Sequence, residues 1–380
     1  MPDSDNGSLE SSSSTSSDVY TETEHTSWFE RIKNALVGIL VGLVLIPASI
    51  VGIFWNEGRA VNTSRSIETA KALVVEAAKV DPANQGKLVH VAGPAAAAAK
   101  LKDPDLAVSA EALRLVRVVE MYQWKERRET ETKTNVGGSE TKVTRYYYDK
   151  VWAEGRNNSS SFKQPSGHEN PEPRLAAFSV TAKDASLGAY KPGESVISRV
   201  SAGTKLPVPG AAVEAAKARF GTGAHLTGDS LCICTDPGSP RIGDLRISYR
   251  ILPAGPLSII GAQSGSDFAP YQTKAGDALL MVETGVKPAD AMFKGAQQAN
   301  TILTWVIRAV AAIAMWIGFM MLFGPFVVLA DVIPFLGSIL GIGAGLAALV
   351  ATLVVAPVSI AIAWFAYRPI VSAIVLGGGL

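Results

Sequence analysis

Two apolar runs at the ends of this chain enclose a long polar stretch. The first run, Asn34–Asn56, holds 23 residues without a charge, and after Arg308 the chain carries only Asp331 and Arg368 as charges. A helix of about 20 apolar residues crosses a bilayer. The pattern therefore predicts a membrane protein that holds a large water-facing domain between its first and second spans.

The same pattern divides the chain into seven segments. Two full spans after residue 332 would place Arg368 inside the bilayer at a cost of roughly 2.5–3.5 kcal/mol, so one span is preferred there. The first run is too long for the apolar region of a signal peptide, and we interpret it as an anchor. The segments are a disordered acidic, serine-rich tail at 1–34, transmembrane helix 1 at 35–55, an extramembrane domain at 56–300, transmembrane helix 2 with its lead-in at 301–330, an interfacial connection at 331–339, transmembrane helix 3 at 340–366, and a turn with a short C-terminal membrane segment at 367–380.

Strand patterns dominate the polar stretch. Leu113–Trp124 is apolar on both faces, as in a central strand. A Gly137-Gly138 turn follows, and Lys142–Glu154 returns with aromatic residues at period two, so we expect a long β-hairpin. The order of elements favours a membrane protein of α+β class whose extramembrane domain is mixed, mostly antiparallel and β-rich. Further strands are expected at Leu88–Ala92, Ala177–Ala182, Leu231–Thr235, Asp244–Ile251, Leu257–Ala262 and Ala278–Glu283, and helices at Asn62–Val80, Ala211–Phe220 and Pro288–Asn300.

Composition and charge narrow the class of partner. Charged residues make up 18% of the chain, below the roughly 25% of a soluble domain, and mean hydropathy is +0.21. Residues 57–300 hold 31 basic and 26 acidic residues, and this balance does not suggest the densely basic face that binds nucleic acid. We therefore expect membrane lipid, further copies of the chain or other membrane proteins as partners, and no nucleic acid. Basic residues precede and follow the first span equally, so charge does not fix the orientation.

The two cysteines, Cys232 and Cys234, would point to the same face of a strand. Without further cysteines or a nearby histidine they lack the four ligands of a zinc site. Two buried free thiols are the preferred interpretation, and a local disulfide is the alternative, open only in an oxidising compartment. The sequence predicts no metal and no cofactor.

One histidine lies in a sequence that could carry chemistry. His168 stands between Gly167 and Glu169, ahead of Asn170 and Pro171. A loop histidine beside a carboxylate could act as a base or a ligand. The competing interpretation is turn architecture, with Asn170 capping a turn ahead of the proline. No nucleophile elbow, P-loop or dinucleotide motif accompanies it, so we expect no enzymatic activity.

The membrane segments supply the other candidates. Glu57 and Arg59 stand where the first helix leaves the membrane, where they could pair with each other or with headgroups as an interfacial anchor beside Trp55. Alternatively, this junction could contact the 270–277 loop, which contains Lys274 and Asp277. Small residues four apart let helices approach closely, and Gly341 in particular is expected to face another helix. These glycines are Gly38 and Gly42 in the first span, and Gly337, Gly341 and Gly345 in the last.

Seven short runs, in their order along the chain, resemble the LUMA family (transmembrane protein 43). The resemblance covers nearly everything after residue 35 and implies a cytosolic N-terminus, a lumenal domain and further spans. In animals such proteins lie in the endoplasmic reticulum and inner nuclear membrane, where they are associated with organising membrane-protein complexes. The basic tail of the animal proteins is absent here. The runs are Asn56–Ala60, Asn84–His90, Val119–Trp124, Gly167–Pro171, Gly243–Ser248, Thr273–Asp277 and Tyr367–Pro369.

The alanine- and glycine-rich composition suggests a bacterial relative, with domain 56–300 outside the cytoplasmic membrane. The function expected first is a non-enzymatic scaffold that organises membrane-protein complexes through its extramembrane domain and its helix packing. A membrane enzyme with a site near His168 is the first alternative. A transporter or channel subunit is the second, and it is disfavoured because the charges stand at the ends of the spans.

Overall fold

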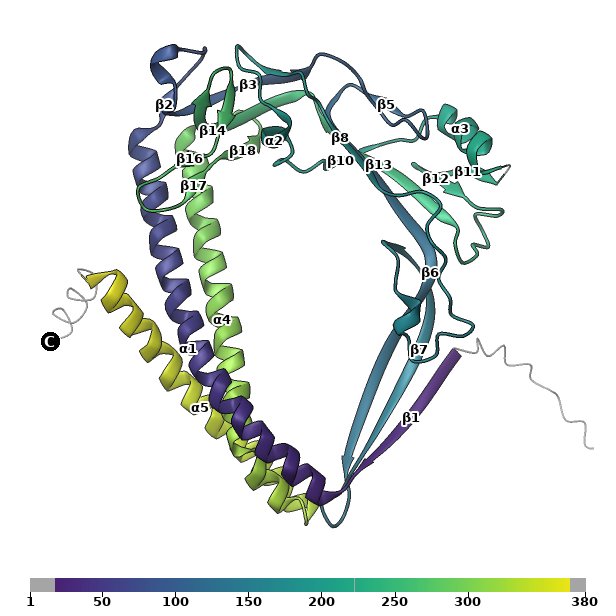
Figure 1. Ribbon diagram of the computed structural model, residues 1–380, viewed down its shortest axis with the longest axis vertical. Helices are drawn as coiled ribbons and strands as arrows, with labels where there is room; N and C mark the ends of the chain where they lie inside the picture. Colours follow the sequence, from purple (N-terminus) through teal and green to yellow (C-terminus); the bar gives the residue numbers. More distant parts are fainter. Residues whose placement is uncertain (1–17, 222, 370–380) are drawn as a thin grey trace, which may run out of the picture.

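The computed structural model describes residues 18–221 and 223–369, and these form a closed frame with two long sides (Figure 1). Three helices build one side: α1 (Trp28–Leu73), α4 (Ala289–Ala330) and α5 (Pro334–Tyr367). A long hairpin of β6 (Ala112–Thr134) and β7 (Glu140–Glu154) builds the other side. The remaining sheet elements join the two sides at one end, and the hairpin tip meets the helices at the other (Figure 1).

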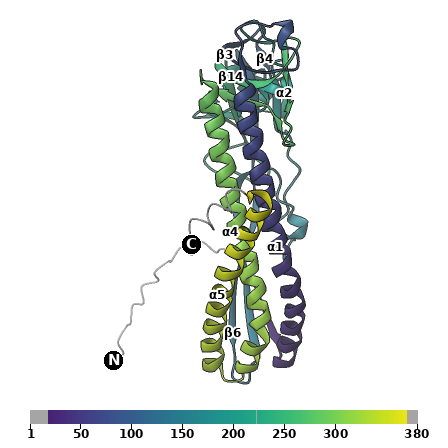
Figure 2. The ribbon, with the colours of Figure 1, turned by 90° about the vertical axis from the view of Figure 1, so that its left-hand side faces the viewer.

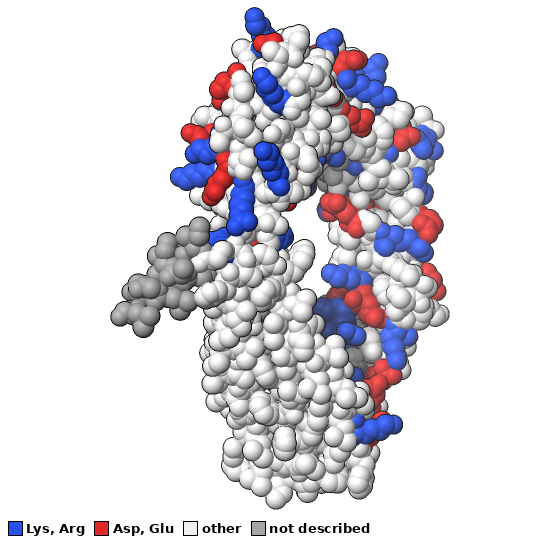
Figure 3. Space-filling view, turned by 60° about the vertical axis from the view of Figure 1, so that its left-hand side comes forward, with Lys and Arg blue, Asp and Glu red and all other residues white. Residues whose placement is uncertain are grey.

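The helices are long and apolar enough to cross a membrane, as predicted. We use the term apolar layer for residues 34–56, 309–330 and 335–366, which contain no charged residue. Figure 3 shows this layer as an uncharged body beneath the charged domain. Figure 2 shows α1 and α4 continuing side by side from the layer into the domain, with α5 against their lower halves. The predicted class, a membrane protein with an α+β extramembrane domain, is confirmed.

Helix boundaries differ from the prediction where capping and pairing override hydropathy. Ser27 caps α1 by accepting a hydrogen bond from the backbone of Glu30, so the helix begins before residue 35. It ends at Leu73 rather than near Val80, because Val75 and Glu76 pair with the sheet as β2. The expected connection at 331–339 shrinks to three residues, because Pro334 opens α5. Of the segment at 367–380, residues 370–380 lie outside the described residues.

The extramembrane domain has two main sheets. The larger runs β1-β7-β6-β13-β12-β11, with β10 on β13 and β8 on β6, and the smaller runs β15-β14-β3-β2, with β18 and β9 attached. Among the described strands only β2 with β3 pairs in parallel. The further bounds are β1 (Asp18–Thr26), β2 (Val75–Glu76), β3 (Leu88–Ala97), β4 (Leu101–Lys102), β5 (Ser109–Ala110), β8 (Phe178–Thr181), β9 (Ala185–Leu187), α2 (Glu194–Ile197), β10 (Thr204–Leu206), α3 (Gly210–Phe220), β11 (Ala224–Thr227), β12 (Ser230–Ile233), β13 (Leu245–Pro253), β14 (Gly255–Ser264), β15 (Asp267–Ala269), β16 (Tyr271–Gln272), β17 (Ala278–Leu279) and β18 (Met281–Thr284).

The tail predicted to be disordered contributes a strand. Residues 18–26 pair with β7 in antiparallel register from Asp18 opposite Tyr148 to Thr26 opposite Glu140. The strand occupies the outer edge of the hairpin, where unpaired backbone groups would otherwise remain open. Glu22 and Glu24 anchor it by ion pairs to Lys163 and Lys142. The prediction of disorder is thus wrong for residues 18–34, and residues 1–17 lie outside the described part.

Two of the three apolar clusters of buried residues involve the extramembrane domain, and the third lies among the membrane helices. The larger fills the domain between the sheets, around buried residues such as Leu113, Leu187 and Ile233. The second joins the upper parts of α1 and α4 to the smaller sheet through Ile67, Ile260 and Phe293. Burial of large apolar side chains stabilises such contacts by about 1.5–3 kcal/mol each. The helices and the domain are therefore one packed unit rather than tethered parts.

A buried ion pair inside the domain had no signal in the sequence. Arg117 points from β6 to both carboxylate oxygens of Asp103, at 2.7 and 2.6 Å, and Tyr249 also donates to Asp103. Arg117 is 2% exposed and Asp103 is 2% exposed. Hydrogen bonds from Arg219 and Arg117 hold the pKa of the neighbouring Asp105 below its usual value. The strand predicted as apolar on both faces therefore carries one buried charge, which its ion pair satisfies.

The cysteines form the disulfide that was the less favoured alternative. Cys232 and Cys234, both buried, are joined at the end of β12, with their Cα atoms 5.4 Å apart. Alternate residues of a strand point to one face, and this spacing lies within the range of disulfides. The interpretation as two free thiols is wrong.

Candidate functional site

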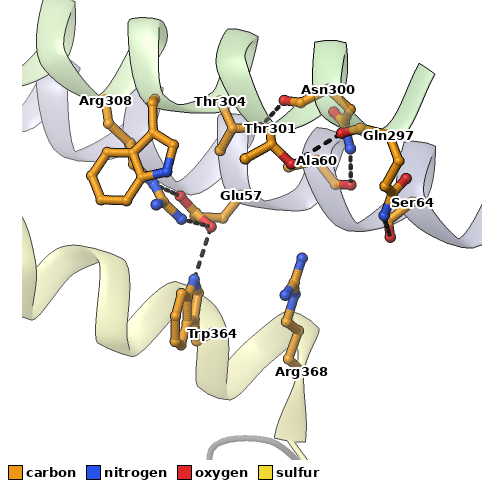
Figure 4. A pocket seen from close by; sticks show the side chains of 11 residues that line it. Glu57, Ala60, Ser64, Gln297, Asn300, Thr301, Thr304, Arg308, Trp364 and Arg368 are labelled. Atoms are coloured by element: carbon orange, nitrogen blue, oxygen red, sulfur yellow. Dashed lines mark hydrogen bonds and ion pairs between the residues drawn. The ribbon is translucent and has the colours of Figure 1, made fainter. Parts of the chain in front are cut away.

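The candidate site lies where α1, α4 and α5 leave the apolar layer (Figure 4). Each helix contributes polar side chains there: Glu57 from α1, Arg308 from α4, and Trp364 from α5. Arg308 is the charge that begins the apolar part of α4, and Trp364 stands near the end of α5. The site thus marks one boundary of the apolar layer on all three helices.

Glu57 links the three helices through a single carboxylate. Its Oε1 accepts from Arg308 Nε at 2.6 Å, and its Oε2 accepts from Arg308 Nη2 at 2.8 Å and from Trp364 Nε1 at 2.9 Å. The carboxylate is 1% exposed. A bidentate arginine pair of this kind is the strongest common form of ion pair. The expectation that Glu57 pairs with Arg59 or with headgroups is wrong, because Arg308 occupies both oxygens.

Gly58 allows the third helix to come this close. A Cβ atom there would lie 2.8 Å from the ring of Tyr367, so a larger residue would push the end of α5 away. The chain does not bend at Gly58, since α1 is continuous through it.

Arg59 belongs to a separate network of neutral partners. Its guanidinium donates to Asn300 Oδ1 at 3.0 Å, to Asn56 Oδ1 at 3.2 Å and to Thr304 Oγ1 at 3.0 Å. Asn56 donates in turn to the Thr304 carbonyl, and Asn300 donates to the Ala60 carbonyl. These bonds join α1 to α4 at a level where backbone and side-chain polar groups would otherwise be buried without partners.

A cavity of about 280 Å³ opens beside Glu57 between the three helices (Figure 4). Arg308 lies over the ring of Trp305 at 4.7 Å, and Arg368 lies 6.0 Å from the ring centre of Trp364. Arg65 of α1 also donates to the Tyr367 carbonyl at the end of α5, at 3.0 Å. The lining residues are Glu57, Ala60, Ser64, Gln297, Asn300, Thr301, Thr304, Trp305, Arg308, Trp364 and Arg368.

A second polar network marks the other boundary of the apolar layer. Arg31 of α1 pairs with Asp331 at 2.5 Å, and it also contacts Glu140 and the Gly138 carbonyl of the hairpin. Trp28 donates to the Val328 carbonyl of α4 at 2.9 Å. The helical rise from one boundary to the other is about 35–39 Å, which is enough for a hydrocarbon core of about 30 Å when the helices tilt.

Polar side chains within the apolar layer are satisfied locally. Ser49, Thr352 and Ser359 each donate to the carbonyl four residues earlier, at 2.7–2.9 Å. Such bonds remove the need for water or for a partner in lipid. Within the described parts of the three helices, the charged residues lie outside the apolar layer. This arrangement offers no support for the transporter alternative.

Among the predicted glycines, only Gly42 brings two helix backbones into contact, and Gly341 faces a second helix through a side chain. A Cβ on Gly42 would lie 2.6 Å from the Gly318 carbonyl, so α1 and α4 touch there through their backbones. Gly38 and Gly345 have no neighbour of this kind within 4 Å, although the Gly345 carbonyl accepts from Trp316 at 3.1 Å. Gly337 packs against Asp331, which caps the end of α4. Gly341 faces α4 as predicted, but a Cβ there would meet the Val327 side chain at an ordinary 3.6 Å, so the backbones do not touch.

His168 has a structural position. Its Nδ1 lies 2.9 Å from the Gln164 carbonyl and its Nε2 lies 3.0 Å from Asp18 of β1, and the ring stacks on Tyr148 at 3.9 Å. The side chain is 4% exposed. Burial raises the pKa of the Tyr148 hydroxyl to about 12, so this hydroxyl keeps its proton and donates to Glu126. A carboxylate is within reach, but both ring nitrogens are already engaged, which leaves no free nitrogen for a base.

Asn170 has a structural role, but it bonds strand β6 and Asn157 rather than capping a turn of its own loop as predicted. Its side chain accepts from the Trp124 amide at 2.7 Å and donates to the carbonyls of Trp124 and Asn157. It thereby closes the free edge of β6 in the manner of a strand partner. No group of three or more potential metal ligands occurs anywhere in the described part of the chain.

The 270–277 loop contacts α1, though not through Glu57 or Arg59. Ser66 Oγ lies 2.8 Å from Thr273 Oγ1, two helical turns above the site. The Asp277 carbonyl closes the β16–β17 turn by accepting from Thr273, and Lys274 is exposed at the turn. The predicted contact between α1 and this loop therefore exists, but Ser66 makes it in place of Glu57 or Arg59.

The sequence correctly pointed to Glu57 and Arg59 as site residues, but it did not reveal their interaction partners. Asn56, Asn300, Thr304, Arg308 and Trp364 complete the site, and they come from segments about 250–300 residues apart. The available signal was the isolated charge of Arg308 at the start of an apolar run, since a charge at that depth requires a partner.

Comparison with known proteins identifies a family and several relatives of this chain. A family model described as Transmembrane protein 43 matches residues 121–369. The chain is 30% identical to Transmembrane protein 43 of mouse over 93% of its own length and 90% of that protein, and 30% identical to the human protein over 92% and 89%. A Transmembrane protein 43 homolog of Drosophila melanogaster is 27% identical over 73% of this chain and 74% of that protein. No solved structure matches.

Proposed function

Since the chain belongs to the Transmembrane protein 43 family, we propose that this integral, multi-pass membrane protein is a non-enzymatic scaffold. It organises complexes of membrane proteins, including further copies of itself. The observation that carries the proposal is the position of the β6–β7 hairpin beside the apolar layer (Figure 1).

The hairpin is polar on both faces at the depth where the helices are apolar. Its lower part carries Arg127, Arg128 and Glu129 on β6, and its tip is fixed to Arg31 and Trp28 at the far boundary. Open strand edges and charges do not face hydrocarbon, because their backbone and ionic groups would be unsatisfied. Protein or water held by an assembly must therefore border the hairpin when the frame is closed.

The test is cross-linking in native membranes with a lysine-reactive reagent, followed by mass spectrometry. Lys125 and Lys133 on the hairpin should form links to other polypeptides or to second copies. Lys87, exposed on the opposite end of the domain, serves as the internal control and should form fewer. A chain that stays monomeric, without links from either hairpin lysine, would overturn the proposal.

We propose in addition that the chain lies in a bacterial cytoplasmic membrane with residues 56–300 outside the cytoplasm. In a eukaryote the corresponding membranes would be the endoplasmic reticulum and inner nuclear membrane. The Cys232–Cys234 disulfide supports this orientation, because disulfides persist in oxidising compartments. Cells denatured directly in an alkylating reagent without reductant should yield both cysteines unmodified. Alkylation of both would reverse the orientation.

A further inference from the structure

A cavity of about 360 Å³ lies within the extramembrane domain, between β10, the turn that joins β11 to β12, and β13. Figure 1 shows these strands in the upper part of the molecule, away from the apolar layer. Cavities that bind small molecules have volumes of about 300–1,000 Å³. The size of this cavity is therefore that of a small-molecule site in contact with water.

Two basic side chains face each other across this cavity without a counter-ion. Lys205 of β10 and Arg250 of β13 are direct partners in the antiparallel ladder, so their side chains lie on the same face of the sheet. Within the described part of the chain, neither side chain forms a hydrogen bond or an ion pair. Val116, opposite Arg250 on β6, adds no charge. Since like charges directly opposite each other repel, this pair destabilises the free protein.

The other charged residues of the lining leave this pair uncompensated. Arg246 is already neutralised, because Glu120 accepts from its Nε at 2.7 Å and from its Nη2 at 2.9 Å. Asp229 is the second carboxylate of the lining, and it lies on the turn between β11 and β12. It forms no ion pair with Lys205 or Arg250. The two opposed bases are thus the groups available to an anion.

Hydroxyl groups complete the lining beside the two bases. Thr227, Ser230 and Ser248 line the cavity, and within the described residues their hydroxyls make no hydrogen bond. A phosphate group has enough acceptor oxygens for two cations and for hydroxyl donors, and a guanidinium matches its geometry. The volume of the cavity leaves room for an organic group attached to the phosphate.

We propose that this cavity binds the phosphate group of a small, soluble phosphate ester. Lys205 and Arg250 contact the phosphate oxygens, so the ligand replaces their mutual repulsion with two attractive contacts. Pairs that break a local rule of stability are expected at functional sites. A soluble ester is favoured over a lipid headgroup because the cavity lies away from the apolar layer (Figure 1).

The test measures the thermal unfolding midpoint of the full chain in detergent, with glycerol phosphate as the probe and sodium chloride at equal ionic strength as the reference. Glycerol phosphate should raise the midpoint, because a ligand of the native state stabilises it. Lys205→Gln and Arg250→Gln should each weaken the apparent affinity about tenfold, the equivalent of one charge-assisted hydrogen bond. Lys87→Gln, on an exposed position at the opposite end of the domain, is the matched control and should leave the affinity unchanged.

Two further results separate binding from a structural role of these side chains. Without ligand, Lys205→Gln and Arg250→Gln should have midpoints equal to or above that of the wild type, because each removes the repulsion. Asp229→Asn should strengthen the affinity for glycerol phosphate, because its carboxylate repels the phosphate. Lower midpoints of both glutamine variants without ligand, or weaker binding by Asp229→Asn, would overturn the proposed role of the pair.

Four outcomes of the binding measurement would overturn the site or its ligand. An equal shift with sodium chloride would reduce the effect to ionic strength, and equal losses in Lys87→Gln would reduce it to general surface charge. An equal affinity for inorganic phosphate would overturn the assignment to an ester. Tighter binding of short-chain phosphatidic acid than of glycerol phosphate would overturn the assignment to a soluble ligand.

Discussion

Glu57 is almost fully buried among three helices, and its negative charge is matched by Arg308. Removing one partner of a buried pair leaves the other charge without compensation, which is worse than removing both. The ion pair of Glu22 with Lys163 on the edge strand is more exposed to water, so losing one partner there has a smaller effect on stability. Because the two pairs differ in burial, substitution is the informative test for Glu57 and titration is the informative test for Glu22.

Glu57→Gln should destabilise the chain by about 3–5 kcal/mol, because Arg308 then lacks a counter-ion between the helices. The measurement is the free energy of unfolding in detergent, with Glu68→Gln as the control on an exposed position of the same helix. The double change Glu57→Leu with Arg308→Met should recover part of the loss. A double variant less stable than Glu57→Gln would contradict the ion-pair explanation.

Acid should release β1 from the hairpin. The hydrogen bond from Lys163 holds the pKa of Glu22 below its usual 4.5. The contribution of Glu22 is therefore complete above pH 4.5 and is lost as pH falls through its lower folded value. The hydrogen-exchange protection factors of residues 18–26 should fall at acid pH, and Glu22→Gln should remove that fall. Unchanged protection of wild-type β1 well below pH 4.5 would show that other contacts hold the strand.

Among the elements, α1 and α4 form the most extended contact, and it includes one point where backbones touch. Gly42 and Gly318 allow that approach, since neither carries a Cβ. The glycine stripe on α5 has no equivalent, because its neighbours are side chains or open space. Spacing of small residues therefore does not identify the contact by itself, and the facing helix decides it.

Gly42→Ala should destabilise the helix pair by about 1–3 kcal/mol through overpacking against the Gly318 carbonyl. Gly38→Ala, one turn away with open space around it, should be neutral or stabilising by up to about 1 kcal/mol, because alanine favours helix. The two unfolding midpoints should thus move in opposite directions. Equal shifts would show that the contact at Gly42 does not contribute.

The sequence predicted elements whose signals are local. The β6–β7 hairpin was identified because alternation and the Gly137-Gly138 turn lie within one stretch, and it is confirmed. The pairing of β1 was missed because its partner lies about 120 residues away and its composition resembles disorder. The partners of Glu57 were missed for a similar reason, since the rotational phase of three helices sets them. The disulfide was weighed, but the choice depended on a compartment that residues alone do not reveal.

For the whole molecule, closure of the frame determines how the chain can lie in a membrane. The first turn of α1, the turn after α4 and the hairpin tip meet at Trp28, Arg31 and Asp331. The family resemblance implies that the N-terminus and the domain lie on opposite sides of the membrane, whereas β1 is part of the domain's sheet. A spanning α1 and a closed frame coexist only if the hairpin passes the apolar layer outside lipid.

Cysteines placed at register partners test closure directly. Thr23→Cys with Val143→Cys, opposite each other in β1 and β7, should form a disulfide on mild oxidation in native membranes. Thr23→Cys with Leu226→Cys, exposed on distant β11, is the control and should remain unlinked. Failure of the first pair to link in membranes, together with linking in detergent, would show that the bilayer holds the frame open.

The β1 strand also imposes an order on synthesis. It leaves the ribosome before its partner, and β7 follows after about 6–25 seconds at about 5–20 residues per second. The turn that seals the frame, after Ala330, follows after about 15–60 seconds. During that interval an early β1 strand can pair with the finished hairpin of an older neighbour on the same messenger. Crowded translation would then yield interlocked dimers by strand exchange, whereas slow initiation would yield singly closed chains.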